Sequence, residues 1–192
     1  LQESATRIRF IGQNGGQFNN QENDSDSQKI LTKLKKTDFD SKLREISFFQ
    51  LVAYLQERKD KLDRTPSIFP TKGHLSSKYG RRVDPFTKKQ TMHMGLDIAN
   101  RQYTPIYAPA DGVVVNTFVN GKLGEFLVID HGYHIVTRYG HLSKYEVRVG
   151  QHVKRGDLIA RMGTTGHSTA SHLHYEILVN DQYVDPEKYL LE

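Results

Sequence analysis

Cysteine is absent from this chain of 192 residues. Disulfide bonds and thiolate metal sites are therefore excluded, and any zinc site has to be built from histidine and carboxylate. No apolar run approaches the roughly 20 residues that a membrane-spanning helix needs. The sequence also begins at Leu1 without a basic start and an apolar stretch, so it shows no signal peptide. From this we expect a mature or trimmed fragment.

A strong charge bias is also missing. The net charge is +5, and the apolar and charged fractions of 36% and 26% are typical of a soluble globular protein. A mildly basic surface suits anionic partners, including the acidic polymers of a cell wall. Nucleic acid is not expected as a partner, because the basic residues are scattered instead of forming a stripe interleaved with aromatic residues.

The first 64 residues differ from the rest in composition and in the spacing of their apolar residues. Residues 1–28 are polar, and we expect a flexible lead there. Apolar residues at 30, 31 and 34 predict one short helix, and a 3-4-7 pattern from Phe48 to Leu62 predicts a second, capped at Asp40 or Ser41. The pattern resembles the end of a coiled coil but contains too few heptads to establish one.

Pro66 and Pro70 end the helical pattern and force an extended connection. We place a domain boundary there, with residues 1–64 as a lead and helical segment and residues 65–192 as one further domain. In this second part, short apolar runs alternate with turn dipeptides such as Asp111-Gly112 and Asn120-Gly121. This spacing predicts a mainly β fold, with a small antiparallel sheet or open barrel.

Nine histidines are present, and several fall into three ordered groups. His93 and Asp97 form an H-x-x-x-D pattern around Gly95, which would let an extended segment bend and bring both side chains together. His141 follows a predicted strand. His172 and His174 alternate with Leu173, so in a strand both imidazoles face the same side, roughly 6–7 Å apart.

Each group alone has an ordinary explanation, since chance H-x-x-x-D pairs are common and two histidines on an edge strand can simply face solvent. Together they supply three ligands and two further acid–base groups. That is the complement of a water-activating zinc site, in which three protein ligands leave a fourth position for water. No Gly-x-Ser-x-Gly elbow is present, so a nucleophilic serine is not indicated.

The ordered motifs are His93-x-Gly-x-Asp97, Tyr-Gly-His141-Leu-Ser, and Thr-Gly-His-Ser-Thr-Ala-Ser-His172-Leu-His174-Tyr-Glu. Over about residues 68 to 188 the chain resembles the lysostaphin-type (LytM-like) zinc metallopeptidases. The segment 77–86 also resembles the one that these enzymes place beside the substrate groove. Ala170-Ser171 depart from the Gly-Pro that commonly precedes His-Leu-His in this family.

The resemblance implies that His93, Asp97 and His174 bind zinc, and that His141 and His172 lie beside the attacking water and the substrate carbonyl. It implies a small β-rich peptidase domain with a groove across an antiparallel sheet. The family's usual substrates are peptide bonds of bacterial peptidoglycan, and this implies an endopeptidase acting in the cell envelope, in a periplasmic or other extracytoplasmic compartment.

Two alternatives stay open. The first is that the chain is a non-catalytic binding module or an activator of another wall hydrolase. The second is that it binds zinc but cuts a different peptide. The helical region leaves open a membrane tether or a coiled-coil partner through a segment that precedes Leu1, or a cover over the groove.

Overall fold

The computed structural model describes residues 20–83 and 87–190, with side chains from residue 25 onward. Most of the predicted flexible lead, and the last three residues of the 77–86 segment, lie outside the described residues. The chain divides into two compact units between Ala53 and Tyr54. Among the described residues, no helix is both long and apolar enough to cross a bilayer.

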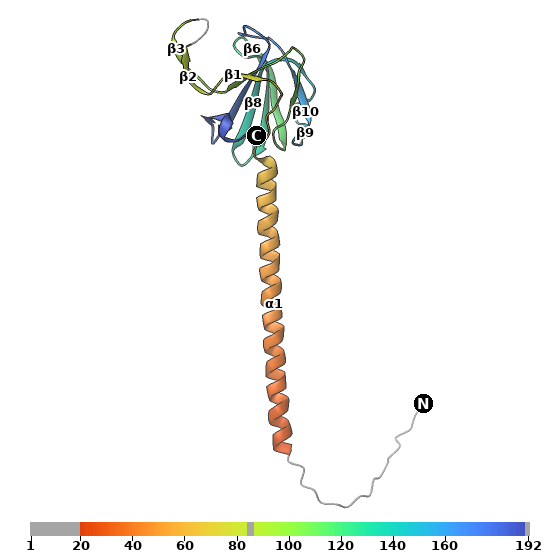
Figure 1. Cartoon of the computed structure of the whole chain (residues 1–192). Coiled ribbons are helices and arrows are strands. Elements are labelled where there is room, and N and C mark those ends of the chain that lie inside the picture. Colours follow the sequence, from red (N-terminus) through yellow and green to blue (C-terminus); the bar gives the residue numbers. More distant parts are fainter. Residues whose placement is uncertain (1–19, 84–86, 191–192) are drawn as a thin grey trace, which may run out of the picture. The chain divides into compact units, whose positions relative to one another are not determined.

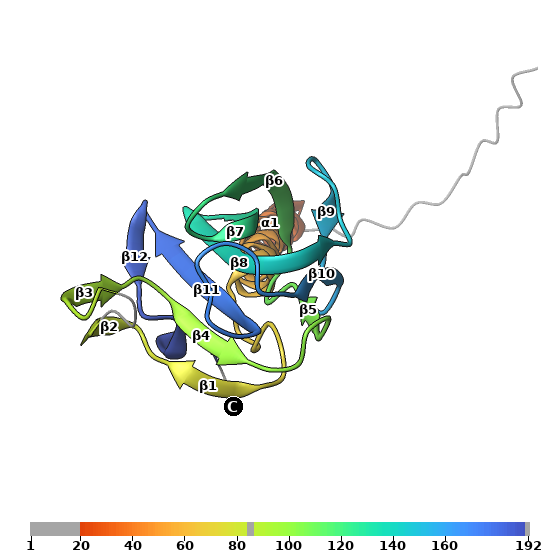
Figure 2. The same cartoon turned by 90° about the horizontal axis from the view of Figure 1, so that it is seen from above.

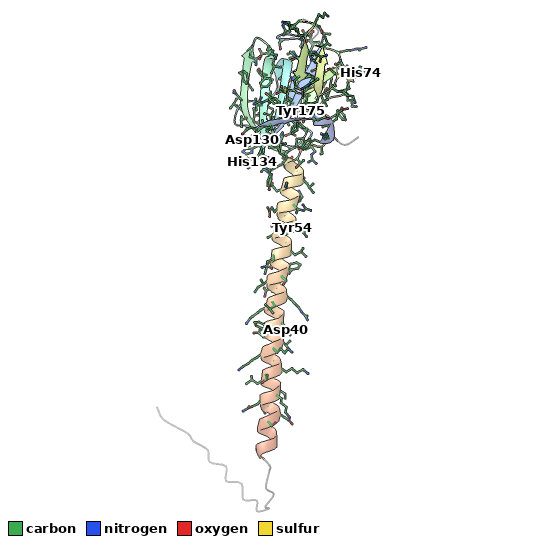
Figure 3. The ribbon with its side chains drawn as sticks, turned by 90° about the vertical axis from the view of Figure 1, so that its left-hand side faces the viewer. Asp40, Tyr54, His74, Asp130, His134 and Tyr175 are labelled. Atoms are coloured by element: carbon green, nitrogen blue, oxygen red, sulfur yellow. The ribbon has the colours of Figure 1, made fainter. Side chains whose placement is uncertain are left out.

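One continuous helix replaces the two short helices predicted near the N-terminus. Helix α1 runs from Asn20 to Arg64 (Figure 1), so the prediction of a flexible stretch to residue 28 was wrong from residue 20 onward. Asp40 lies in the middle of α1 and not at a cap (Figure 3). No glycine or proline interrupts this segment, and pairs such as Lys42 with Asp38 support it at i,i+4 spacing.

The last turns of α1 belong to the second unit and are fixed to it by polar contacts. The Arg155 guanidinium donates to the carbonyls of Leu62, Asp63 and Thr65, at 2.6, 3.2 and 3.3 Å. The Tyr133 hydroxyl donates to Asp60 at 3.0 Å. Arg155 therefore binds carbonyls at and just after the helix end, where the Leu62 and Asp63 carbonyls also accept from the amides of Thr65 and Asp111.

The rest of the second unit is an antiparallel sheet of ten strands with a separate two-stranded sheet, which confirms the mainly β prediction. The main path runs β1-β4-β11-β8-β7-β6-β9, and Figure 2 shows β11 between β4 and β8. The pair β2-β3 forms the small sheet. The elements are β1 (His74–Ser77), β2 (Gly80–Val83), β3 (Gln90–His93), β4 (Leu96–Ala99), β5 (Pro105–Tyr107), β6 (Gly112–Asn120), β7 (Gly124–Gly132), β8 (Ile135–Tyr145), β9 (His152–Val153), β10 (Leu158–Met162), β11 (His172–Val179), β12 (Gln182–Val184) and η1 (Pro186–Lys188).

The core lies on one face of this sheet, opposite the face that carries the histidines of β11. Leu173, Tyr175 and Ile177 of β11 are completely buried in it, while His172, His174 and Glu176 alternate with them along the strand. The apolar side chains therefore anchor β11, and the polar ones are held in fixed positions on its other face.

Candidate metal centre

Two imidazoles and one carboxylate meet where β3, β4 and β11 come together. His93 ends β3, and Asp97 of β4 lies directly opposite His174 of β11 in the antiparallel register. His93 Nε2 is 3.1 Å from Asp97 Oδ1, while His174 Nδ1 is 2.8 Å from the same oxygen and 3.1 Å from His93 Nε2. All three side chains are buried. Asp97 and His174, which are 77 positions apart in the chain, thus meet at one buried site. We call the site formed by His93, Asp97 and His174 the corner.

The outer hydrogen bonds determine which ring nitrogens face this corner. A backbone carbonyl can only accept, so His93 Nδ1 donates to the Lys78 carbonyl at 2.8 Å and turns its Nε2 inward. The carboxylate of Glu176 likewise accepts from His174 Nε2 at 3.1 Å, which turns His174 Nδ1 inward. Two nitrogens and one carboxylate oxygen therefore face each other, an arrangement that favours a positive charge among them.

The pKa shifts agree with this interpretation. Burial would raise the pKa of Asp97, but hydrogen bonds from His174 and His93 outweigh it and hold that pKa well below its usual range. Burial would lower the pKa of His174, yet hydrogen bonds to Asp97 and Glu176 prevail and raise it to about 9. The corner therefore stabilises added positive charge.

The donor set fits zinc. His93, Asp97 and His174 each offer a ligand atom, all within 4.8 Å of one another. Ligands of a tetrahedral zinc ion lie about 3.3 Å apart, and the observed separations of 2.8 to 3.1 Å differ from that by about half an ångström or less. Two imidazole nitrogens and one carboxylate oxygen are also a common ligand set of catalytic zinc.

His141 and His172 lie beside this corner with their rings 4.6 Å apart. His141 Nδ1 donates to the Thr165 carbonyl at 2.7 Å, and His172 Nδ1 donates to the Ala170 carbonyl at 2.8 Å. His172 Nε2 is 3.8 Å from Asp97 Oδ1, so it faces the three donors. Burial lowers the pKa of His141 to about 4. The Ala170-Ser171 departure thus keeps a carbonyl that orients His172.

His141 also has an unusual backbone. Its φ is 59°, a left-handed conformation that costs a non-glycine residue free energy. Its amide donates to the Leu123 carbonyl at 2.7 Å. His141 therefore lies within β8 and not after a strand as predicted, and contacts hold both its backbone and its side chain.

A pocket of about 380 Å³ opens over these residues. It contains all five predicted site residues, and Arg82 and His167 also line it. Tyr139, two residues before His141, does not line the pocket and is completely buried in the core. Alternation along the strand places it there, since its neighbour Arg138 faces the other side.

Sequence reasoning assigned no role to Glu176 and did not predict the contact between Arg82 and Asp97. Glu176 contacts His174, and Arg82 Nη1 lies 3.3 Å from Asp97 Oδ2. Lys122 lines the pocket as well. A signal for Glu176 was present, because it follows His172 and His174 at the same two-residue period and so lies on the same strand face. The contact of Arg82 depends on the β2–β3 hairpin and had no such signal.

Comparison with known proteins decides the family. The model of peptidase family M23 matches residues 91–186, a segment that contains all three donors together with His141 and His172. This chain belongs to peptidase family M23. The peptidoglycan DD-endopeptidase ShyA of Vibrio cholerae is 41% identical over 138 residues, covering 70% of this chain and 32% of the relative. The DD-carboxypeptidase/endopeptidase Mpg of Neisseria meningitidis is 39% identical over 112 residues, covering 58% and 26%.

Solved M23-type structures share the fold. A zinc-containing peptidase from Vibrio cholerae superposes with a TM-score of 0.60 at 38% identity, covering 65% of this chain and 40% of that one. The catalytic domain of lysostaphin from Staphylococcus simulans gives a TM-score of 0.56 at 30% identity, covering 61% and 91%. The chain spans about a third of the length of ShyA and about a quarter of that of Mpg.

Proposed function

We propose that this chain is a zinc-dependent endopeptidase that hydrolyses peptide bonds in bacterial peptidoglycan. The observation that carries the proposal is the buried corner in which His93 Nε2, Asp97 Oδ1 and His174 Nδ1 lie within 3.1 Å of one another. Membership of peptidase family M23 supports the reaction class. The activities for which ShyA and Mpg are named support the substrate class.

A zinc ion held by these residues would supply Lewis acidity, polarising a carbonyl and making water more acidic. His141 and His172 perform the proton transfers. Because each Nδ1 is committed to a backbone carbonyl, each Nε2 is the nitrogen that can act in the pocket. One Nε2 accepts the proton of the attacking water, and the other, when protonated, donates a hydrogen bond to the oxyanion.

The proton then passes to the leaving amine, which completes hydrolysis with one water consumed and no covalent enzyme intermediate. Arg82 holds Oδ2 of Asp97 at 3.3 Å and leaves Oδ1 facing the two imidazoles. The arrangement therefore needs no nucleophilic side chain, in keeping with the absence of cysteine.

The proposal extends to the organisation of the chain. Residues 65–192 form the peptidase domain, and residues 1–64 lead to it. The site of action is the cell envelope, which is where peptidoglycan lies. Apolar side chains of α1, including Ile46, Phe48 and Phe49, are more than half exposed. These exposed side chains support a partner helix or a tethering segment as the contact of α1.

The test pairs zinc content with products from purified peptidoglycan. We expect one zinc ion per chain by elemental analysis and new peptide fragments in mass spectra of digested sacculi. His93→Ala, Asp97→Ala and His174→Ala should lose both zinc and products. His141→Ala and His172→Ala should retain zinc and lower kcat by about 10²- to 10⁴-fold.

Other outcomes refute specific parts. A protein that binds zinc and sacculi without releasing fragments would be a binding module. Fragments released from a protein substrate but not from sacculi would change the substrate class. Undiminished digestion of sacculi by Asp97→Ala would refute the assignment of the metal centre.

A further inference from the structure

Glu176 is buried on the same face of β11 as His172 and His174, but nothing in the reaction described above requires it to touch the substrate. It is only 4% exposed. Its Oε1 accepts from His174 Nε2 at 3.1 Å, whereas its Oε2 is buried with no hydrogen-bond partner among the described residues. A buried carboxylate is costly unless it is paired, so its placement beside a ligand calls for an explanation.

The contact determines which nitrogen of His174 faces the centre. His174 lies between two carboxylates, with Asp97 Oδ1 2.8 Å from Nδ1 and Glu176 Oε1 3.1 Å from Nε2. With Asp97 alone, the neutral ring would place its proton on Nδ1 and point it at the metal position. Glu176 keeps a proton on Nε2, so the proton that leaves when a metal ion binds is the one on Nδ1, which then offers its lone pair.

The surrounding structure holds Glu176 in place. Arg138 lies directly opposite it on β8, with Nη1 3.8 Å from Glu176 Oε2. Arg138 in turn donates to the Tyr183 hydroxyl at 2.9 Å, and its guanidinium lies 5.6 Å from the centre of the Tyr183 ring. A cation that is itself anchored thus faces the second oxygen of the carboxylate.

Gly95, between the two ligands of the H-x-G-x-D motif, provides the space. A Cβ at this position would lie against the Tyr175 carbonyl and 3.1 Å from Cγ of Glu176. A side chain at residue 95 would therefore push β4 away from β11 or displace Glu176. The glycine of the motif fits the close approach of these two strands.

We propose that Glu176 is a positioning residue of the metal centre, whose carboxylate fixes His174 in the tautomer that offers Nδ1 to the ion. The inference rests on the zinc site of the proposed function. The hydrogen bond from His174 to Glu176 is equivalent to the one from His93 to the Lys78 carbonyl, since each holds the ring nitrogen that faces away from the metal position. Outer hydrogen bonds of this kind orient metal-binding imidazoles and raise their basicity.

The test is zinc affinity, measured by competition with a chromogenic chelator on the full chain. Glu176→Gln keeps the shape of the side chain but removes its charge, and its amide can donate to Nε2 and so favour the wrong tautomer. We expect its dissociation constant for zinc to rise about 10- to 100-fold. The matched control is Glu146→Gln, which removes a carboxylate paired with Arg161 at 2.7 Å and outside the pocket.

Long-range ¹H–¹⁵N NMR of the zinc-loaded protein provides a readout that a merely structural role would not change. It should show the proton on Nε2 of His174 in the unsubstituted chain. Circular dichroism of the zinc-stripped proteins checks that Glu176→Gln folds. If it does not fold, Glu176→Asp, which withdraws the carboxylate by one methylene, serves as the second variant and should also bind zinc more weakly.

Unchanged zinc affinity in a folded Glu176 variant would overturn the positioning role while leaving the proposed function intact. Equal losses in Glu176→Gln and Glu146→Gln would overturn it too, since the effect would then not be specific to the site. Failure of the unsubstituted chain to bind zinc would refute the metal centre itself.

Discussion

His131 makes the stability of this protein sensitive to acid. Its side chain is completely buried, with Nδ1 donating to the Asp111 carbonyl at 2.7 Å and Nε2 accepting from the Thr137 hydroxyl at 2.8 Å. The Tyr139 hydroxyl lies 2.8 Å from that of Thr137, so the chain of hydrogen bonds continues into the core. Every link suits a neutral imidazole, and burial lowers the pKa of His131 from 6.5 to about 4.

The sign and size of the effect follow from these two pKa values. As the pH falls below 6.5, the unfolded chain takes up a proton at this residue and the folded chain does not, so unfolding becomes more favourable. The contribution of neutral His131 is complete above pH 6.5 and is lost as the pH falls towards 4. At about 1.4 kcal/mol per pH unit, the loss between pH 7.5 and 4.5 is roughly 2.5 kcal/mol.

The measurement is urea unfolding of zinc-stripped protein at both pH values, followed by the near-ultraviolet circular dichroism of tyrosine. His131→Gln keeps one donor and one acceptor but cannot be protonated. Its unfolding free energy should therefore fall by roughly 2.5 kcal/mol less than that of the unsubstituted chain over this pH interval. His152→Gln, a substitution at an exposed residue of β9, is the matched control. Equal pH dependence in the unsubstituted chain and His131→Gln would refute the reasoning.

Three further predictions concern other parts of the fold. Gly95→Ala should lose about 1–3 kcal/mol of stability and bind zinc poorly, because of overpacking between β4 and β11; Gly121→Ala, where an added Cβ meets nothing within 4 Å, should melt like the unsubstituted chain. Arg155→Ala should lose about 1 kcal/mol and speed hydrogen exchange around residues 62–67, since the guanidinium contacts to three carbonyls are removed and that of Thr65 loses its donor; Lys154→Ala should not, and equal exchange in both would contradict the capping role. Chelation of zinc should lower the melting temperature, with about 4 kcal/mol lost relative to protein in zinc at a thousand times its dissociation constant; an unchanged melting curve would argue against a folded-state metal site.

The strands of the second unit were predictable from local chemistry. Runs of β-branched and aromatic residues between turn dipeptides correspond to β6, β7, β8 and β11. Alternation along β11 also placed His172 and His174 on one face. The helix was mispredicted because Asp40 and Ser41, good capping residues, were given more weight than the lack of any glycine or proline from residue 20 to 64.

The convergence of the site could be postulated from the sequence, but local sequence patterns do not determine it. Whether Asp97 lies opposite His174 depends on the register of β4 against β11, and a shift by one residue would turn one side chain to the other face. The hydrogen-bond partners of the proposed metal ligands were harder still to predict. The acceptor for His93 is a backbone carbonyl, that of Lys78, and such an acceptor has no sequence signature.

The order of the central strands has a consequence for how the protein matures. Asp97 and His174 come from neighbouring strands that are distant in the chain, and His141 follows on the next strand, β8. A partly synthesised or partly folded chain contains the ligands only as isolated side chains with weak affinity. Under the proposed function, tight zinc binding is therefore a late event that requires the completed β4-β11-β8 array, and hydrolysis begins only after folding is complete.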